Sequence, residues 1–225
     1  MARVVKEYDE RRNEILESAQ ALFYSEGYEQ TSIQDIIDTV GIAKGTFYYY
    51  FSSKSNLLDE LIMQMLQQSK QLVEPLLTDD ELTALEKVRR FFSIISDWKT
   101  GKRPFLLRIL AAYYDENNVI LRHRMKIETN RTMAPFLSEI IQQGVNDGSF
   151  DILYAEDMGE IVLTLAQSLS ESLAELLLDG SGQENLLRLA EKRAIVHQYA
   201  LEKLLGAPQG SLPIIEMTNL RQWFS

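Results

Sequence analysis

The sequence contains no cysteine and only two histidines among its 225 residues. Without cysteine the chain can form neither disulfides nor thiolate metal sites, and this composition fits a reducing compartment. A helical metal-carboxylate enzyme needs Glu-x-x-His pairs, and neither His123 nor His197 has a glutamate three residues before it. A glycine-rich phosphate loop and a nucleophile elbow are also missing. The sequence therefore argues against an enzyme and predicts no metal or other cofactor.

Long apolar runs are lacking as well. The N-terminal stretch MARVVKEYDERRNEI has no apolar segment of the kind found in signal peptides, and no later stretch approaches the length of a membrane span. Hydrophobic residues still make up 45% of the chain, which is ample for a folded core. We therefore expect a soluble cytoplasmic protein with one large or two smaller domains.

A short amphipathic helix is predicted directly after Ser32. Thr31 and Ser32 precede it, where a hydroxyl can cap its free backbone N–H groups, and Gly41 ends it as a residue able to adopt positive φ. Its apolar residues fall at i, i+3, i+4 and i+7 and share one face. They are Ile33, Ile36, Ile37 and Val40.

A second short helix is predicted from Ala43 to Phe51. Phe47 and Phe51 lie four residues apart on its inner face. The opposite side is basic and aromatic, and it comprises Lys44, Gly45 and Tyr48, flanked by Thr46 and Tyr49. Two short helices joined by a glycine turn, with such an outer face on the second, indicate a helix-turn-helix.

The run G-I-A-K-G-T-F-Y-Y-Y-F-S-S-K-S-N-L, from Gly41 to Leu57, resembles the DNA-binding signature of the TetR family of transcriptional regulators. So does the preceding pattern R-x-x-I-L-x-S-A-x-x-L-F-x-x-x-G-Y-x-x-T-S-I-x-x-I, from Arg12 to Ile36. Two positions depart from the family pattern. Ala43 stands where a capping Ser is common, at a cost of about 1 kcal/mol. Asn56 replaces a Glu three residues after Ser53, which leaves half a capping box at the next helix.

The resemblance implies which residues contact DNA. The second helix would enter the major groove with its N-terminal end, Lys44 reaching a guanine edge or a phosphate and Gly45 allowing close backbone approach. Hydroxyls and tyrosine rings would contact thymine methyls, bases and phosphates, and Lys54 would bind a phosphate at the start of the following helix. The implied DNA-contact residues are Thr31, Ser32, Lys44, Gly45, Thr46, Tyr48, Tyr49, Tyr50 and Lys54.

Charge complicates this interpretation. The whole chain carries a net charge of −10, whereas DNA-binding domains usually have a basic footprint. In the first 58 residues, nine acidic residues outnumber six basic ones, but the basic residues lie at positions that would face phosphates. We expect a locally basic surface on an acidic body and a marked salt dependence of binding. The six are Arg3, Lys6, Arg11, Arg12, Lys44 and Lys54.

The remaining chain keeps helical apolar spacing and shows no strand pattern, so the fold class predicted is all-α with about nine helices. Pro135 should kink or split the long helix over 119–147. We expect a helix-turn-helix domain over 1–52, an effector-binding and dimerisation domain over 53–206 whose first helix bridges the two, and a tail over 207–225. After the helix-turn-helix, helices are predicted over 53–74, 80–99, 105–114, 119–147, 155–179 and 184–205, with a turn over 101–104.

Family members of this kind are homodimers that bind small molecules, so the resemblance implies a homodimer and a small-molecule site for this chain. The helices over 155–179 and 184–205 would pair with their symmetry mates through Ile161, Leu165, Leu169, Ser172, Leu176, Leu189, Val196 and Tyr199. A small-molecule effector of unknown identity would lie among the helices of the larger domain. Candidate pocket residues are Phe91, Trp98, Phe105, Arg108, Tyr113, His123, Glu128 and Gln167.

The function predicted is sequence-specific transcriptional regulation, namely repression at a palindromic double-stranded operator that a small-molecule effector relieves. The main alternative is an all-helical adaptor or ligand-binding protein that does not bind DNA, and a helical enzyme is a further one. An adaptor that had lost DNA binding would have a disrupted outer face on the second helix, yet Lys44, Gly45, Thr46 and Tyr48 are all present.

Overall fold

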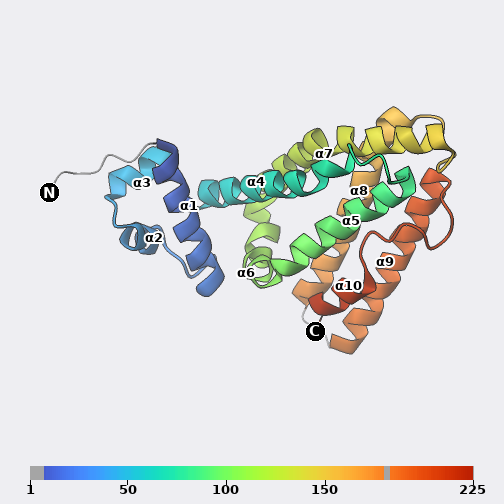
Figure 1. Cartoon of the computed structure of the whole chain (residues 1–225). Coiled ribbons are helices and arrows are strands. Elements are labelled where there is room, and N and C mark those ends of the chain that lie inside the picture. The colour runs from blue at the N-terminus through green and yellow to red at the C-terminus, as the bar shows by residue number, and fades with distance from the viewer. Residues whose placement is uncertain (1–7, 180–182, 225) are drawn as a thin grey trace. The chain divides into compact units, whose positions relative to one another are not determined.

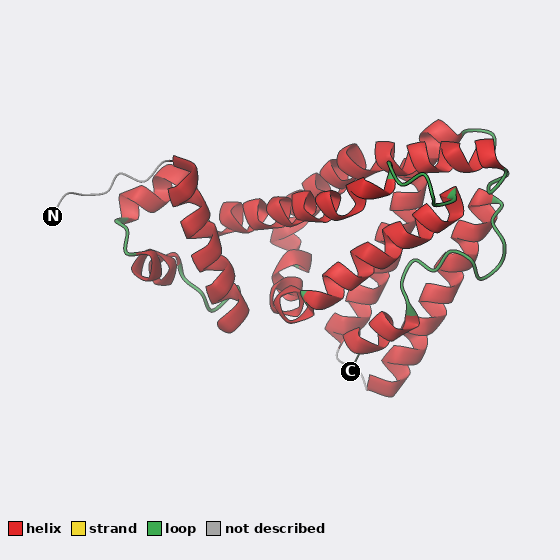
Figure 2. Cartoon of the chain, in the orientation of Figure 1, coloured by secondary structure: helices red, strands yellow, loops and turns green. Residues whose placement is uncertain are grey.

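The computed structural model describes residues 8–179 and 183–224, which form helices joined by short loops (Figures 1 and 2). These residues contain ten α-helices and two short 3₁₀ helices and no β-strand, which confirms the all-α prediction. The helices are α1 (Tyr8–Ser25), α2 (Ile33–Val40), α3 (Lys44–Tyr50), α4 (Lys54–Val73), η1 (Glu74–Leu76), α5 (Ala84–Gly101), α6 (Arg103–Tyr114), η2 (Glu116–Asn118), α7 (Val119–Asp147), α8 (Ala155–Asp179), α9 (Gln183–Leu205) and α10 (Met217–Trp223).

The chain divides into two compact units. The first runs to Leu66 and also includes Pro104–His123, and the second comprises Gln67–Arg103 and the chain from Arg124 onward. Helices α4, α6 and α7 each pass from one unit into the other. The predicted functional boundaries near residues 52 and 206 remain predictions.

In the first unit, α1 packs on α2 and α2 packs on α3. The inward face of α1 is built from Ile15, Leu16, Ala19 and Phe23, all of which are buried. Gly27 then turns the chain with φ of 97°, a left-handed value that favours glycine. A Cβ at this position would also lie 2.8 Å from Oε1 of Gln30. That oxygen is the end of a flexible side chain that can move aside, so the turn after α1 requires glycine for its backbone conformation.

In the second unit, α8 packs along α9, and α10 packs on both α5 and α9 (Figure 1). The start of α8 approaches α7 closely at Gly159, because a Cβ there would lie 2.1 Å from the Ala134 carbonyl oxygen. The Ser138 hydroxyl donates to the Glu156 carbonyl oxygen at 2.7 Å and accepts from the Gly159 N–H at 3.1 Å. Close backbone approach at Gly159 and the hydrogen bonds of the Ser138 hydroxyl together hold this helix crossing.

The segment after α9 is part of the folded second unit. Leu212 and Leu220 are fully buried. Asn219 donates to Ser96 Oγ at 3.0 Å and to Asp97 Oδ1 at 2.6 Å. The Trp223 indole N–H donates to Thr100 Oγ1 at 3.1 Å. The predicted tail over 207–225 therefore contains a helix, α10, which is held on the last turns of α5.

Glu202 on α9 anchors the loop that leads to α10. Burial of this carboxyl opposes its ionisation, but hydrogen bonds from Gln198 and from the backbone N–H groups of Gly210, Leu212 and Ser211 outweigh that effect, so its pKa is lowered. The carboxylate accepts from the Leu212 N–H at 3.1 Å. The loop after Gly206 is therefore organised around one nearly buried anion.

Three details differ from the helices predicted above. Helix α7 continues through Pro135, so the predicted split does not occur. Helix α5 begins at Ala84 rather than near residue 80, because Thr83 and Glu86 form a capping box at its start. Helix α5 also runs to Gly101 and α6 begins at Arg103, so the predicted turn over 101–104 is reduced to Lys102.

The contacts of α10 give a stability prediction. Asn219→Ala removes both hydrogen bonds to the end of α5 and should lower the free energy of unfolding by about 1–3 kcal/mol. Thr218→Ala is the matched control, because Thr218 is the exposed neighbour on the same helix. Urea denaturation followed by circular dichroism measures both variants. Equal stability of the two variants would contradict this role for Asn219.

Candidate nucleic-acid interface

Helix α2 begins and ends as the sequence predicts. Ser32 is its N-cap: the Ser32 side chain accepts from the Asp35 N–H at 3.2 Å, and the Asp35 carboxylate accepts from the Ser32 N–H at 2.8 Å. These hydrogen bonds to the backbone and hydroxyl of Ser32 hold the pKa of Asp35 below its ordinary value. Gly41 ends α2 with φ of 70° and donates its N–H to the Ile37 carbonyl oxygen.

Helix α3 is anchored by two phenylalanines, Phe47 within it and Phe51 at its C-cap. They have exposed fractions of 0% and 1%, and their ring centroids lie 5.9 Å apart. Ala43 provides no side-chain cap, as predicted, so the first N–H groups of α3 have no side-chain acceptor at that position. Burial of the phenylalanine face, rather than capping, therefore orients this seven-residue helix.

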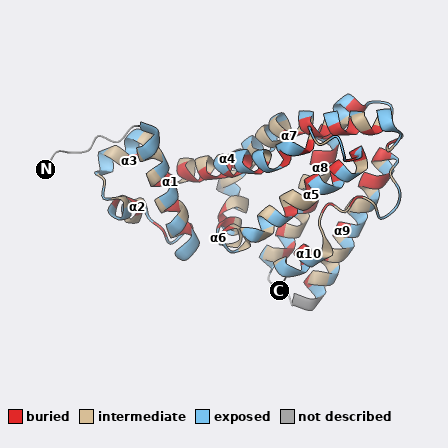
Figure 3. Ribbon diagram, viewed as in Figure 1, coloured by how far each residue is buried: buried red, intermediate tan, exposed pale blue. Residues whose placement is uncertain are grey.

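The opposite face of α3 is open to solvent (Figure 3). Lys44 and Gly45 are exposed, Tyr48 and Tyr49 have exposed fractions of 47% and 70%, and Thr46 is half-buried. A Cβ added at Gly45 would meet no atom within 4 Å, so nothing inside the protein requires glycine there. The predicted outer face is thus present as an accessible surface.

Tyr8 extends this surface, although no pattern in the sequence indicates that it does. Its ring centroid lies 4.8 Å from that of Tyr50 and 5.9 Å from that of Tyr49, and Tyr8 is half exposed. Tyr50 is half-buried between these neighbours. The first residue of α1 therefore joins a cluster of three tyrosines with α3, through contacts between residues more than forty positions apart.

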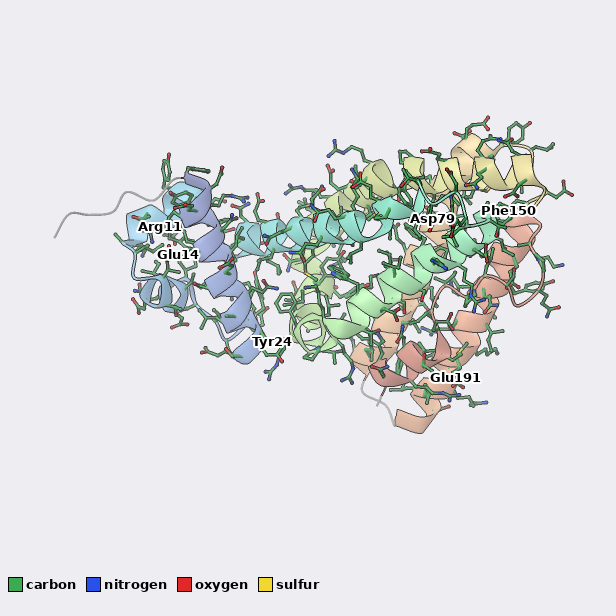
Figure 4. All side chains as sticks on the ribbon, in the orientation of Figure 1. Arg11, Glu14, Tyr24, Asp79, Phe150 and Glu191 are labelled. Atoms are coloured by element: carbon green, nitrogen blue, oxygen red, sulfur yellow. The ribbon has the colours of Figure 1, made fainter. Side chains whose placement is uncertain are left out.

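Two arginines expected to face phosphates have acidic partners instead. Arg11 pairs with Glu14 at 2.5 Å, and both side chains are labelled on α1 in Figure 4. Arg12 pairs with Glu60 of α4 at 2.5 Å, and its guanidinium lies 5.6 Å from the centre of the Phe51 ring. Their charges are therefore largely compensated within the protein. Arg3 and Lys6 lie outside the described residues.

Two of the predicted DNA contacts do not fit the geometry. Thr31 is fully buried, and its hydroxyl donates to the Gly27 carbonyl oxygen at 2.8 Å, so its side chain cannot reach a phosphate. The Lys54 ammonium donates to the carbonyl oxygens of Tyr28 and Thr31 at 2.8 and 3.0 Å. It also lies 4.2 Å from the centre of the Tyr28 ring. Both side chains serve internal contacts because the turn after α1 folds back onto the start of α4.

Few basic side chains near α3 remain available to contact DNA. Four basic side chains are described between Tyr8 and Leu58, and of these only Lys44 has neither an ion pair nor a hydrogen bond. The predicted locally basic surface is therefore reduced, among the described residues, to one exposed lysine beside a tyrosine cluster. Aromatic rings and hydroxyls dominate this surface.

The eight candidate pocket residues are distributed over both units. In the second unit, Phe91 is buried against Phe92 and Phe136, and Lys102 covers Trp98. Glu128 pairs with Arg131, and Gln167 donates to Asn130 at 3.4 Å while its Oε1 is buried without a hydrogen bond. In the first unit, Phe105 is buried, Arg108 and His123 are exposed, and the Tyr113 carbonyl accepts from Arg122. Phe91 and Phe105 are core residues, and a shared pocket remains a prediction.

Helices α8 and α9 carry the predicted dimer residues. Leu169 and Leu176 are buried within the protomer, so they belong to its core rather than to an exposed interface. Ile161, Val196 and Tyr199 are each about half exposed. The other three predicted residues, Leu165, Ser172 and Leu189, are half-buried.

Helix α8 bears on the expectation that no stretch of the chain is long and apolar enough to span a membrane. By length and composition, Ala155–Asp179 could cross a membrane, although only 28% of its most apolar window is buried within the protein. The expectation that no stretch approaches a membrane span is therefore wrong. One side of this helix packs on α9, and its other sides carry exposed apolar residues such as Ile161 and Leu178.

Comparison with known proteins agrees with the helix-turn-helix geometry. Residues 15–61 match the family described as bacterial regulatory proteins, tetR family. ArpR of Pseudomonas putida, a probable HTH-type transcriptional regulator, is 24% identical over 157 residues, which are 67% of this chain and 75% of that protein. The repressor KstR2 of Mycolicibacterium smegmatis is 29% identical over 143 residues, covering 62% of this chain and 67% of that protein.

Solved structures share the fold. A transcriptional regulator from Cytophaga hutchinsonii superposes with a TM-score of 0.62 at 16% identity, covering 84% of this chain and 95% of that one. Thermus thermophilus FadR, a TetR-family repressor in complex with lauroyl-CoA, superposes with a TM-score of 0.60 at 20% identity, covering 88% of this chain and 100% of that one. The matching family and these relatives are transcriptional regulators rather than enzymes. The chain is a DNA-binding transcriptional regulator, and its residues 15–61 match the tetR family of bacterial regulatory proteins.

Proposed function

We propose that the protein is a homodimeric repressor that binds a palindromic operator with α3 of each protomer in successive major grooves. The observation that carries this proposal is the combination of a buried phenylalanine face and an open polar face on α3. The relatives support repression, because KstR2 is named as a transcriptional repressor. Relatives of this kind are bacterial, and a regulator that binds their DNA acts in the cytoplasm.

The DNA contacts follow from what α3 exposes. Lys44 is exposed and has no partner among the described residues, and in the proposed complex it would reach a guanine edge or a phosphate. Tyr48 and Tyr49 offer rings to bases and hydroxyls to phosphates, with Thr46 beside them. Ser32, at the start of α2, adds a hydroxyl to this set of proposed DNA contacts. Because Lys44 is the one basic side chain without a partner among the described residues from Tyr8 to Leu58, specificity should depend more on aromatic and hydroxyl contacts than on charge.

The larger domain is proposed to bind a small-molecule effector that releases the operator. FadR, which shares the fold, was solved with lauroyl-CoA, and this supports a ligand-binding role for the corresponding helices here. An effector favouring a conformer in which α4 shifts would disturb the spacing of the two recognition helices. Helix α4 is suited to this role because it is a continuous helix with residues in both units. Unchanged operator affinity at a saturating effector concentration would refute this part of the mechanism.

The first test is selection of bound sequences from random duplex DNA. The wild type should enrich a palindromic site, and a Lys44→Ala, Tyr48→Ala double variant should lose it, with affinity falling by about a hundredfold or more. A double variant with Lys126→Ala and Tyr154→Ala is the matched control, since both residues are exposed and lie outside the helix-turn-helix. No enrichment by the wild type at low salt would refute the DNA-binding function as proposed.

Gly45 allows stability and DNA binding to be separated. Gly45→Ala should stabilise α3 by about 0.5–1 kcal/mol, because alanine is the better helix former and its Cβ meets no atom here. The same Cβ should weaken operator binding by keeping the helix backbone away from DNA. Gly101→Ala is the control, because Gly101 is also helical with open space around it. Urea denaturation and fluorescence anisotropy measure the two effects, and a Gly45→Ala variant with unchanged affinity would exclude close backbone approach.

The proposed dimer interface can be tested by substituting an exposed apolar residue of α9. Val196, with an exposed fraction of 55%, should lie against the partner protomer together with Ile161 and Tyr199. Val196→Glu should therefore give monomers in sedimentation velocity and abolish high-affinity operator binding, because two half-sites need two recognition helices. Leu153→Glu is the control, since Leu153 has an exposed fraction of 89% and lies outside α8 and α9. A Val196→Glu protein that remains dimeric would place the interface elsewhere.

A further inference from the structure

Lys54 occupies a position that is unfavourable for its charge. It is the first residue of α4, where the unpaired N–H groups of a helix create a partial positive charge that favours anions. The first turn of α4 contains no acidic residue. A lysine at this point needs a compensating partner, and a DNA phosphate is one obvious candidate.

The structure shows a different partner. Besides the Tyr28 and Thr31 carbonyl oxygens, the Glu29 carbonyl oxygen lies 3.5 Å from Nζ, at the outer limit of a hydrogen bond. An ammonium group has three N–H donors, and three backbone carbonyls surround this one. All of these carbonyls belong to the short turn between α1 and α2. The ammonium therefore has no donor left over for a phosphate in this conformation.

Tyr28 closes the site from the other side. Its side chain is buried and stacks edge-on against Phe23, with ring centroids 5.1 Å apart. Burial, together with the carboxylates of Glu29 and Asp59, raises the pKa of Tyr28 to about 12. The phenol thus stays neutral across the physiological range. Its ring face is then available to the Lys54 ammonium as a cation–π partner.

The turn that Lys54 holds leads directly into α2. The Thr31 N–H and hydroxyl both donate to the Gly27 carbonyl oxygen, which leaves the Thr31 carbonyl oxygen directed to Lys54. The next residue is Ser32, the N-cap of α2. The position of Ser32, and with it the start of α2, is therefore linked to the start of α4 through one side chain.

We infer that Lys54 is a positioning residue for DNA binding: it holds the α1–α2 turn, and thereby Ser32 and α2, against the start of α4 instead of contacting phosphate. This inference rests on the DNA-binding function described above and replaces the phosphate contact that the sequence suggested for this lysine. Loss of the contact should let the turn and α2 move relative to α4. The exposed DNA-facing side chains themselves would be unchanged.

The first test needs no DNA. Lys54→Met keeps the length and apolar stem of the side chain but removes its donors and charge. Hydrogen exchange of the free protein should become faster at residues 28–35 while the amides of α1 around Ile15 and Leu16 keep their protection. A general loss of stability would accelerate both regions together. Unchanged exchange at residues 28–35 would overturn the inference, whether or not the operator has been found.

The second test uses the salt dependence of binding to the operator selected by the wild type. Lys54→Met should weaken binding by about tenfold at every salt concentration and leave the slope of log K against log salt unchanged. Lys44→Met is the matched control, and it should reduce the magnitude of that slope by about 0.9 for each lysine removed. A reduction of the same size in Lys54→Met would overturn the inference, because it would show that Lys54 contacts phosphate.

A conservative variant separates positioning from charge. Lys54→Gln restores two N–H donors without a positive charge, so it can still bond to the turn carbonyls. It should recover part of the affinity and part of the exchange protection lost in Lys54→Met. If Lys54 acted on phosphate through its charge, glutamine would bind the operator no better than methionine. If Lys54→Gln recovers exchange protection but the wild-type protein does not bind the selected operator, the positioning role is supported and the proposed operator is not.

Discussion

Burial of Phe47 and Phe51 is the interaction on which the DNA-facing surface depends. A helix of seven residues is too short to be stable alone, so its tertiary contacts must supply the stability that its length does not. Because the two rings are four residues apart, their burial also fixes the rotation of α3 about its axis. That rotation leaves Lys44, Gly45 and Tyr48 outside. The absence of a side-chain cap at Ala43 makes this aromatic anchor still more important.

The electrostatic character of the helix-turn-helix differs from that of a basic DNA-binding module. Arg11 and Arg12 form ion pairs with Glu14 and Glu60, and the Lys54 ammonium donates to backbone carbonyl oxygens. Among the residues that the structure describes there, Lys44 is the one exposed basic side chain without a partner, and tyrosine rings and hydroxyl groups lie beside it. Such a surface gains little from long-range attraction to DNA, and the acidic remainder of the chain opposes it. Discrimination between sequences would then come from short-range contacts, which penalise incorrect DNA more than charge does.

The sequence predicted those features of the site that depend on neighbours in the chain. The spacing of Ile33, Ile36 and Ile37, the cap at Ser32 and the turn at Gly41 are all local, and the structure contains each of them. The sequence did not predict the roles of Thr31, Arg12 and Lys54, whose side chains looked free to meet phosphate. Lys54 bonds to residues 23 and 26 positions away, and Arg12 pairs with a residue 48 positions away. Periodicity contains no information about such partners, because they depend on how the helices pack.

At the end of the chain, partners are still more distant in sequence, and this distance has a consequence for biosynthesis. Asn219 and Trp223 bond to residues of α5 that lie 122 or 123 positions earlier. During translation α5 therefore emerges long before the helix that completes its packing. The contacts from α1 to α3, by comparison, can form as soon as the first sixty or so residues have left the ribosome, since loops of that length close readily. The DNA-reading bundle should thus be formed while the second unit still waits for α10, and the order of synthesis separates the two folding events in time.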